Sequence, residues 1–402
     1  MINFVVQASS RSWAGDIEHC MNEINGYPAV YWTIKRIYNN FKEANVILVA
    51  PEYDAQGELN KLKSHFEDLI IVYAHDSSPL LRIIKATKSL NNEHFIRLNA
   101  LNFQFDISLF QQIYQLAKVN NYDCVKFPDD YPVHFTCEVY KPSALILLNN
   151  ILNSGEIENP NIHEIHPKFL LMRRPEFNCK YFTPQDELDI EDIEEYRENM
   201  KQVMFSERQE VSGDKQILSG DQLTYHYDLS EEFMNSKGIT SGKILDIACG
   251  TGYGSKKLSG KNYQIVAADY DKQQIEKNIV ALAHCQDIAF KQEDITNISF
   301  PDNTFDVALS METIEHVEPH KTLRELKRVI KDGGYLIIST PQNSCPSKCV
   351  NPQHIYEYSL KELTDLVSQY FAIERITGLK AGKIHFNDDP IGANTIIFAR
   401  NQ

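Results

Sequence analysis

The segment Met311–His316 brings together side chains that can move protons. Glu312, Glu315 and His316 are spaced i, i+3 and i+4, which would place them on one face of an α-helix. An imidazole oriented by a carboxylate can take the proton of an acceptor hydroxyl, which contributes ~10²–10⁴-fold in rate. His316 is therefore a candidate general base, with Glu315 as its orienting partner. The alternative is that these groups only tie a helix to a loop.

His354 is a second candidate base, in the segment Asn351–Tyr356. A purely structural role for this histidine remains open. Cys345 and Cys349 precede it at a spacing that suggests metal binding, but one close cysteine pair without a second pair makes a poor zinc site. The eight cysteines of the chain are too sparse and uneven for a disulfide framework, so we expect reduced thiols.

A glycine-rich turn indicates a ligand site. A hydrophobic strand ending near Ala248 leads into Gly250, Gly252 and Gly254, and glycines let the backbone adopt positive φ and approach a ligand closely. Such a site would lie at the carboxyl end of the strand, where open α/β sheets bind ligands. Asp269 ends the next predicted strand and is placed to accept hydrogen bonds from ribose hydroxyls.

The spacing of the glycines bears on which nucleoside ligand binds there. Dinucleotide sites use G-x-G-x-x-G, whereas the third glycine here comes one residue too early. Asp246, at the end of the strand, would also repel a pyrophosphate. A carboxylate at this position suits a cationic ligand with an ammonium and a sulfonium group. The pattern therefore favours S-adenosylmethionine over NAD.

The elements that position these residues alternate between strand and helix in both halves of the chain. Apolar runs predict strands in the first half at residues 4–6, 46–49, 69–72 and 94–98, with helices at 28–39 and 80–90. In the second half they predict strands at residues 243–248, 264–269, 288–291, 305–310, 335–340 and 395–399. This alternation predicts two layered α/β domains with mostly parallel sheets.

An acidic segment separates the halves. Residues 185–198 contain eight acidic side chains against one arginine, with Leu188, Ile190, Ile193 and Tyr196 at roughly helical spacing. We interpret it as a solvated connecting helix. The expected organisation is a first domain at 1–182, a helical linker at 183–204 and a second domain at 205–402.

Composition excludes several function classes. A chain of 402 residues exceeds the size of one hydrophobic core, so two domains are the default. The net charge of −15 argues against nucleic acid and anionic membrane surfaces as partners. No charge-free apolar run is long enough for a membrane span, and no basic segment precedes the first strand, so we expect a cytoplasmic protein without membrane insertion. The expected partner is a small-molecule acceptor, and self-association stays open.

The second half resembles class I S-adenosylmethionine-dependent methyltransferases, whose domain is Rossmann-like. Residues 245–255 resemble their first motif, 268–270 the ribose-binding motif, 293–295 the adenine motif, 300–306 the entry to the fourth strand and 326–334 the turn before the fifth. The resemblance implies cofactor contacts from Tyr225, Asp246, Ala248, Gly250, Gly252, Asp269, Tyr270, Asp294, Ile295 and Met311.

Two finer resemblances concern the acceptor side. The Glu-x-x-Glu-His spacing of Glu312, Glu315 and His316 is similar to that of ubiquinone-type O-methyltransferases, where these side chains can engage a divalent cation. Residues 206–209 and 222–227 resemble a lead-in helix of methyltransferases associated with cell-surface glycan genes. Tyr225 or Tyr227 would then cover the methionine end of the cofactor, unless it only packs.

Residues 1–182 resemble cytidylyltransferases with a GT-A-like fold, which act on acidic sugars and spore-coat polysaccharide precursors. The segments 4–11, 24–28, 80–82, 97–100, 127–130 and 137–139 carry the resemblance. The departures fall on the chemistry: the phosphate loop has Asp16 and Glu18 but no lysine, and Leu101 replaces the family's metal-binding aspartate. Without the lysine of the phosphate loop and the metal-binding aspartate, nucleotidyl transfer would lose most of its electrostatic stabilisation.

Three hypotheses follow. The leading one is an O-methyltransferase for a sugar or nucleotide-linked acceptor in surface-glycan assembly, with a catalytically inactive first domain that holds a ligand or partner. The second is a bifunctional enzyme with an active cytidylyltransferase. The third is a non-enzymatic module in which both domains only bind ligands.

Overall fold

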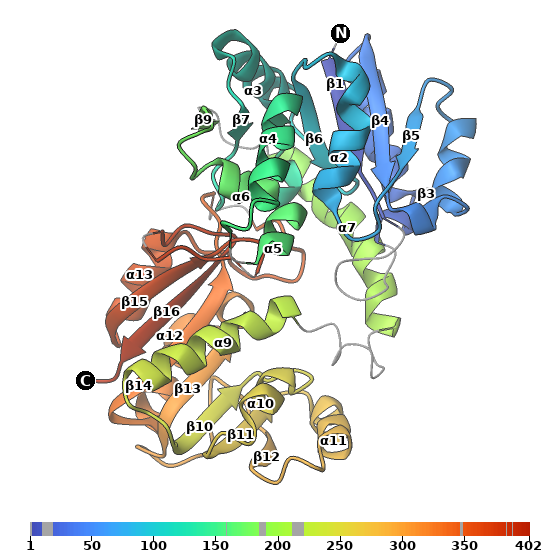
Figure 1. The fold of residues 1–402 in the computed structure, drawn as a ribbon. Coiled ribbons are helices and arrows are strands. Elements are labelled where there is room, and N and C mark those ends of the chain that lie inside the picture. The colour runs from blue at the N-terminus through green and yellow to red at the C-terminus, as the bar shows by residue number, and fades with distance from the viewer. Residues whose placement is uncertain are drawn as a thin grey trace. The chain divides into compact units, whose positions relative to one another are not determined.

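The structure is a computed structural model that describes residues 2–9, 19–157, 159–184, 190–210, 221–345, 349–382, 384–387 and 389–402. The chain divides into two compact units, Met1–Ser212 and Gly213–Gln402 (Figure 1). Each unit is built around its own mostly parallel sheet. Both are α/β, as the alternation of strands and helices predicts.

The sheet of the first unit has the strand order β5-β4-β1-β6-β8-β7-β9. Neighbouring strands are parallel except where β8 pairs with β6 and β7. The chain winds outward from β1 to β4 and β5 on one side, and then returns to β6 on the other side of β1. The strands are β1 Ile2–Gln7, β4 Ala44–Ala50, β5 Ile70–Tyr73, β6 Phe95–Asn99, β7 Cys124–Lys126, β8 Glu138–Tyr140 and β9 Cys179–Tyr181, with a separate ribbon of β2 Glu23–Ile24 and β3 Tyr27–Pro28.

Helices cover both faces of this sheet. Val5 of β1 points into a core made with α2, α4 and α6, while the neighbouring Phe4 points to the other face, against Phe41 at the end of α1. The helices are α1 Ala29–Asn40, α2 Pro79–Thr87, α3 Ile107–Asn120, α4 Pro142–Leu152, α5 Pro160–Ile165, α6 Pro167–Leu171 and α7 Ile190–Glu210, with 3-10 helices at His19–Met21, Glu52–Asp54, Glu58–Ser64, Lys88–Leu90 and Val133–Phe135.

The acidic segment forms α7, and this helix is part of the first unit rather than a solvated connector. Tyr196 is buried and stacks on Phe103, with ring centroids 4.9 Å apart. The side-chain amide of Asn22 donates to the carbonyl of Val203, near the far end of the helix. Ile193 and Tyr196 therefore pack inward, whereas the prediction left the whole helix in solvent. Residues 185–189 lie outside the described ranges.

The sheet of the second unit has the order β12-β11-β10-β13-β14-β16-β15. The strands from β12 to β14 are parallel, and β16 runs antiparallel to β14 and β15. The order reverses between β10 and β13, which creates a crevice at the carboxyl ends of these strands. The strands are β10 Gly242–Ile247, β11 Tyr263–Asp269, β12 Ile288–Gln292, β13 Phe305–Met311, β14 Ile330–Pro341, β15 Ala372–Leu379 and β16 Asn394–Arg400.

Helices also cover both faces of the second sheet (Figure 1). One core joins the sheet to α9, α10 and α11, and another joins it to α12 and α13. The bounds are α9 Asp221–Ser236, α10 Tyr253–Leu258, α11 Lys272–Ala281, α12 Pro319–Val329 and α13 Leu360–Ser368, with a 3-10 helix at Ile314–His316. None of the helices in the described ranges combines the length and apolar content that a membrane span requires.

Candidate functional site

A pocket of about 240 Å³ lies at the carboxyl ends of the parallel strands of the second unit. It sits where the strand order reverses, the position at which open α/β sheets bind ligands. The lining residues follow β10, β11, β12 and β13 in turn. They are Ile247, Ala248, Asp269, Tyr270, Glu293, Ile295, Glu312, Thr313, His316 and Val317.

Two lining residues, Ala248 and Glu312, adopt the left-handed backbone region without being glycine, with φ of 60° and 49°. Such conformations cost of order 1–3 kcal/mol and cluster at functional sites. Gly250 and Gly252 continue the turn with φ of 52° and 72°, where a side chain would be strained. Ile247 and Ala248 line the pocket, so the backbone that leaves β10 forms part of the pocket wall.

Asp246 is buried at the end of β10, and both of its oxygens accept hydrogen bonds. The hydroxyl of Tyr227 donates to Oδ1 at 2.9 Å, and that of Ser255 donates to Oδ2 at 2.5 Å. Burial raises the pKa of Asp246 to about 6, although these two hydrogen bonds oppose the rise. Gly254 makes the arrangement sterically feasible, because a Cβ there would lie 1.9 Å from the Tyr227 ring.

Asp269 lies at the end of β11 and faces the same pocket. The N–H of Gly250 donates to its Oδ2 at 2.9 Å, and the N–H of Asp271 donates to Oδ1 at 3.0 Å. These bonds fix the carboxylate between the glycine turn and the rim. Tyr270 beside it is exposed, so its ring is available to a planar ligand.

Of the other residues predicted to contact the cofactor, some line the pocket and others do not. Ile295 lines the pocket, whereas Asp294 is exposed and its Oδ1 accepts from the N–H and the hydroxyl of Thr296. Met311 is buried at the end of β13. Of the two tyrosines expected near the methionine end of the cofactor, Tyr227 contacts Asp246. The hydroxyl of Tyr225 instead lies 2.8 Å from Nδ1 of His385. Residues 206–209 belong to α7, and their side chains lie outside the described part of the chain.

The expected helical face of Glu312, Glu315 and His316 is not formed. The left-handed turn at Glu312 ends β13 before the 3-10 helix Ile314–His316 begins. Its carboxylate accepts hydrogen bonds from Ser339 and Asn394, at 2.7 and 2.6 Å. Burial would raise the pKa of Glu312, but these bonds and the nearby His226 hold it below its usual range. Glu312 therefore stays outside the group that Glu315 and His316 form, although its charge acts on Glu315.

Glu315 and His316 instead meet His354, which comes from the segment after β14. Their ligand-capable atoms all lie within 4.8 Å of one another, and the two imidazole rings are 4.9 Å apart and edge to face. Glu315 is buried and accepts a hydrogen bond of 2.8 Å from Thr340. Burial and the negative charge of Glu312 raise the pKa of Glu315 to about 8. The two histidines predicted as alternative bases thus form one group.

Known proteins resemble the part of the chain that holds this pocket. The methyltransferase domain family matches residues 245–338. The second unit contains a methyltransferase domain. This match agrees with the S-adenosylmethionine-dependent class I type that the sequence motifs resemble.

Curated relatives agree on the reaction class. A probable S-adenosylmethionine-dependent methyltransferase of Mycobacterium tuberculosis is 30% identical over 32% of this chain and 47% of its own length. A demethylmenaquinone methyltransferase of Clavibacter sepedonicus is 38% identical over 26% of this chain and 44% of its own length. A ubiquinone/menaquinone biosynthesis C-methyltransferase of Pseudomonas fluorescens is 34% identical over 28% and 48%. The chain thus spans about half the length of the curated relatives it matches.

Among solved structures, an S-adenosylmethionine-dependent methyltransferase from Aquifex aeolicus is 22% identical. It covers 49% of this chain and 98% of its own, with a TM-score of 0.38.

Sequence reasoning missed one residue of the methyltransferase unit that matters to its histidine group. Glu357 is buried, and its Oε1 lies 2.8 Å from Nδ1 of His354. The i, i+3 spacing of these two residues is a signal in the sequence, but the segment has no regular secondary structure that would turn this spacing into a shared face.

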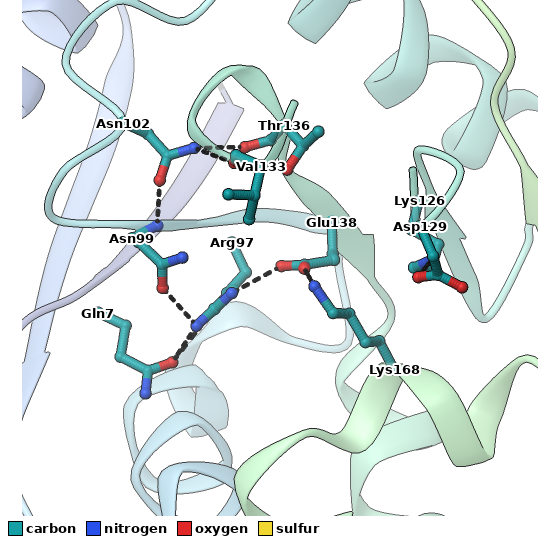
Figure 2. Close-up of polar contacts among 10 residues, drawn as sticks. All are labelled: Gln7, Arg97, Asn99, Asn102, Lys126, Asp129, Val133, Thr136, Glu138 and Lys168. Atoms are coloured by element: carbon teal, nitrogen blue, oxygen red, sulfur yellow. Dashed lines mark hydrogen bonds and ion pairs between the residues drawn. The ribbon is translucent and has the colours of Figure 1, made fainter. Parts of the chain in front are cut away.

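The first unit has a polar cluster at its own strand-order reversal, between β1 and β6 (Figure 2). Arg97 donates to Glu138 at 2.9 Å, to Gln7 at 2.6 Å and to Asn99 at 2.7 Å. Lys168 donates to the other oxygen of Glu138 at 2.5 Å. Burial alone would raise the pKa of Glu138, but Lys168 and Arg97 outweigh it and lower the pKa to about 2.

Position 101, where the cytidylyltransferase resemblance expects a metal-binding aspartate, lies in the turn after β6. The neighbouring Asn102 closes this turn by hydrogen bonds to Asn99, Val133 and Thr136 (Figure 2). The leucine at 101 offers no oxygen to a metal ion. Asp16 and Glu18, the acidic residues of the predicted phosphate loop, lie outside the described residues.

Proposed function

We propose that the protein transfers a methyl group from S-adenosylmethionine to an oxygen of a small sugar or nucleotide-linked acceptor, in the cytoplasm, as a step of surface-glycan biosynthesis. The observation that carries the reaction class is the pocket at the strand-order reversal, with Asp246 behind the glycine turn and Asp269 on its rim. Bound S-adenosylmethionine supplies the methyl group on a sulfonium.

The residues present suit this cofactor. At Gly250 no atom lies within 4 Å of the position a Cβ would take, so the turn leaves room for a ligand beside the backbone there. Asp269 and Ile295 line the pocket and suit ribose hydroxyls and an apolar base, respectively. Asp246 is buried just before the glycine turn, and its negative charge favours a ligand with a cationic amino-acid end. Most of the rate of an in-line displacement can come from holding the two reactants in line, so the role of the pocket is mainly orientation.

Transfer to oxygen is supported by the group next to the pocket. His316 lines the pocket, and Glu315 and His354 lie directly beside it. These side chains can take the proton that an acceptor hydroxyl loses when its oxygen is methylated. Methylation of a ring carbon is the second candidate, because curated relatives are named as quinone-pathway methyltransferases.

We further propose that the first unit is a cytidylyltransferase-like domain that has lost nucleotidyl transfer and holds a ligand or partner. The supporting observation is Leu101, which stands in the turn after β6 beside the intact polar cluster of Arg97. An active cytidylyltransferase and a purely binding role for both units remain the competing functions.

Two measurements test the proposal. Isothermal titration should show S-adenosylmethionine binding to the full chain, and failure to bind in a folded sample would refute a methyltransferase. Mass spectrometry should then compare small molecules from cells with and without the gene. The proposed reaction predicts sugar-containing species that become lighter by one CH₂ in its absence, whereas a change confined to quinones would support carbon methylation.

A further inference from the structure

Two cysteines of the first unit face each other across neighbouring strands of its sheet. β9 is the outermost strand on one side of the described sheet and runs parallel to β7, with Cys124 as the register partner of Cys179 (Figure 1). Register partners in adjacent strands project toward the same face of a sheet. Both cysteines accordingly contact one apolar core, Cys124 as a buried member and Cys179 as a partly buried neighbour. The two thiols therefore lie side by side.

The spacing of these strands suits a disulfide. Neighbouring strands lie about 4.7–4.9 Å apart, and the Cα atoms of disulfide-bonded cysteines lie roughly 4.4–6.8 Å apart. The register is fixed on both sides of the pair. The N–H of Asp123 donates to the carbonyl of Asn178 at 2.8 Å, and the N–H of Phe182 donates to the carbonyl of Lys126 at 2.8 Å. β9 has only 3 residues, so its backbone can make the small adjustment that a bond between the sulfurs needs.

The two thiols differ in their access to solvent. Cys179 is partly exposed, whereas Cys124 is fully buried. Burial raises the pKa of the Cys124 thiol well above its usual range, and Cys179 beside it raises this pKa further. Since the thiolate is the reactive form, reagents in solution reach Cys179 first and Cys124 is protected from them. The charge of Lys126 on the same strand opposes the rise and favours the Cys124 thiolate.

We propose that Cys124 and Cys179 form a reversible disulfide when the protein meets the disulfide of a small thiol, such as oxidised glutathione. In the first step, the Cys179 thiolate attacks one sulfur of the oxidant, which gives a mixed disulfide and releases one small thiolate that takes up a proton. In the second step, Cys124 loses its proton and attacks Sγ of Cys179, and the second small thiolate leaves and is protonated. One S–S bond thereby replaces two S–H bonds of the protein, and the oxidant is reduced to two thiols.

The disulfide would close the segment between positions 124 and 179, which carries Glu138 and Lys168 of the polar cluster (Figure 2). A disulfide constrains the unfolded chain and so stabilises the folded unit that contains it. Oxidation would therefore hold β9 on β7 and stabilise the part of the unit that carries the cluster. In a reducing compartment such a bond is transient, so it reports the redox state. The inference is independent of methyl transfer, because both cysteines belong to the first unit.

The test is peptide mapping of the full-length protein by mass spectrometry without reduction. The fully reduced protein is incubated with oxidised glutathione, and the remaining thiols are blocked before digestion. We expect a linked pair of peptides that contain Cys124 and Cys179, lighter by two hydrogen atoms than the free peptides together and separated again by dithiothreitol. The linked protein should unfold at a temperature about 4–16 °C higher, measured by tryptophan fluorescence.

Variants separate the two steps. Cys124→Ala should stop the reaction at the mixed disulfide, so that Cys179 keeps one glutathione. Cys179→Ser should leave Cys124 unmodified, because the buried thiol no longer has a neighbour that reacts first. Cys285→Ser, which removes a partly exposed cysteine of the second unit, should form the linked peptides like the wild type. Circular dichroism shows that each variant is folded.

Three results would overturn the proposal. The first is a wild-type protein in which Cys179 keeps its glutathione and no linked peptides form. The second is a bond from Cys179 to a cysteine other than Cys124. The third is modification of Cys124 in the Cys179→Ser variant as fast as in the wild type, which would show that Cys124 does not depend on its neighbour.

Discussion

The Tyr227 hydroxyl donates a 2.9 Å hydrogen bond to Asp246, which links α9 to the end of β10 in the buried interior of the second unit. Ser255 occupies the second oxygen, so the carboxylate is oriented from two sides. Because these two hydrogen bonds already fix the carboxylate of Asp246, a cationic ligand that binds near it does not have to pay for ordering that side chain.

Substitution of Asp246 by asparagine should weaken S-adenosylmethionine binding by about 10- to 100-fold, because a charge-assisted interaction of ~1.5–3 kcal/mol is lost. The pKa of about 6 adds a pH signature. Below pH 6 the carboxyl group becomes protonated and loses its attraction for the cation, so affinity in the wild-type protein should fall as the pH drops through 6.

Isothermal titration between pH 5 and 8 checks this prediction. The Asp246→Asn variant should bind weakly without a step near pH 6, and Glu276→Gln on the exposed side of α11 should behave like wild type. Equal affinities of wild type and Asp246→Asn at pH 8 would show that Asp246 does not act through its charge.

Gly254→Ala should destabilise the methyltransferase unit by about 1–3 kcal/mol, since the new Cβ would clash with the Tyr227 ring at 1.9 Å. Thermal unfolding followed by circular dichroism measures the loss. In a Tyr227→Ala background, the same change should cost much less, because the clashing ring is gone. Additive effects in the double variant would contradict the close packing of these two residues.

Glu138→Gln should destabilise the first unit by about 3–5 kcal/mol, because Arg97 and Lys168 would be left without their buried counter-charge. The folded pKa of Glu138 is lowered from 4.5 to about 2. Its contribution is therefore fully present above pH ~4.5 and is lost as the pH falls toward 2, so the gap between wild type and variant should close over that window.

Tryptophan fluorescence suits this measurement, because both tryptophans, Trp13 and Trp32, belong to the first unit. The matched control is Glu58→Gln, which removes an exposed pair with Lys61 and should change stability by less than about 0.5 kcal/mol. A Glu138→Gln protein as stable as wild type at pH 7 would show that the cluster does not stabilise the fold.

The wild-type protein should release no pyrophosphate from CTP and Mg²⁺ with any acidic sugar, because Leu101 cannot bind a metal ion. Leu101→Asp should bring a low rate above background if position 101 is the missing ligand. A coupled pyrophosphate assay across a sugar panel measures both proteins. Turnover by the wild type would establish the bifunctional enzyme instead.

The sequence predicts the strands of both sheets well where apolar residues are consecutive, as in β4 and β13. It misses β15. A register shift between Ile373 and Arg375 breaks the alternation of that strand, so Ile373 and Ile376 fall three apart, which resembles a helical pattern. Pairing with β16 stabilises β15 despite this irregularity, but the irregularity removes the two-residue periodicity by which a strand is recognised in the sequence.

The sequence predicts which motifs contribute residues to the candidate site, but not which side chains from different motifs lie together. Asp246 and Asp269 sit beside the glycine turn, as their positions at strand ends predict. The separation of Glu312 from Glu315 follows from one left-handed residue, which spacing rules for a regular helix do not anticipate. The meeting of His316 with His354 depends on the path of an irregular segment, which carries no periodic signal.

The bond from Asn22 to Val203 in α7 spans 181 positions of the chain. During synthesis, the first unit therefore cannot complete its fold until its last helix has left the ribosome. At ~5–20 residues per second, that wait amounts to roughly 10–40 s. During this time the surface that α7 later covers, including the ring of Phe103 that stacks on Tyr196, stays open to chaperones or to association with other chains.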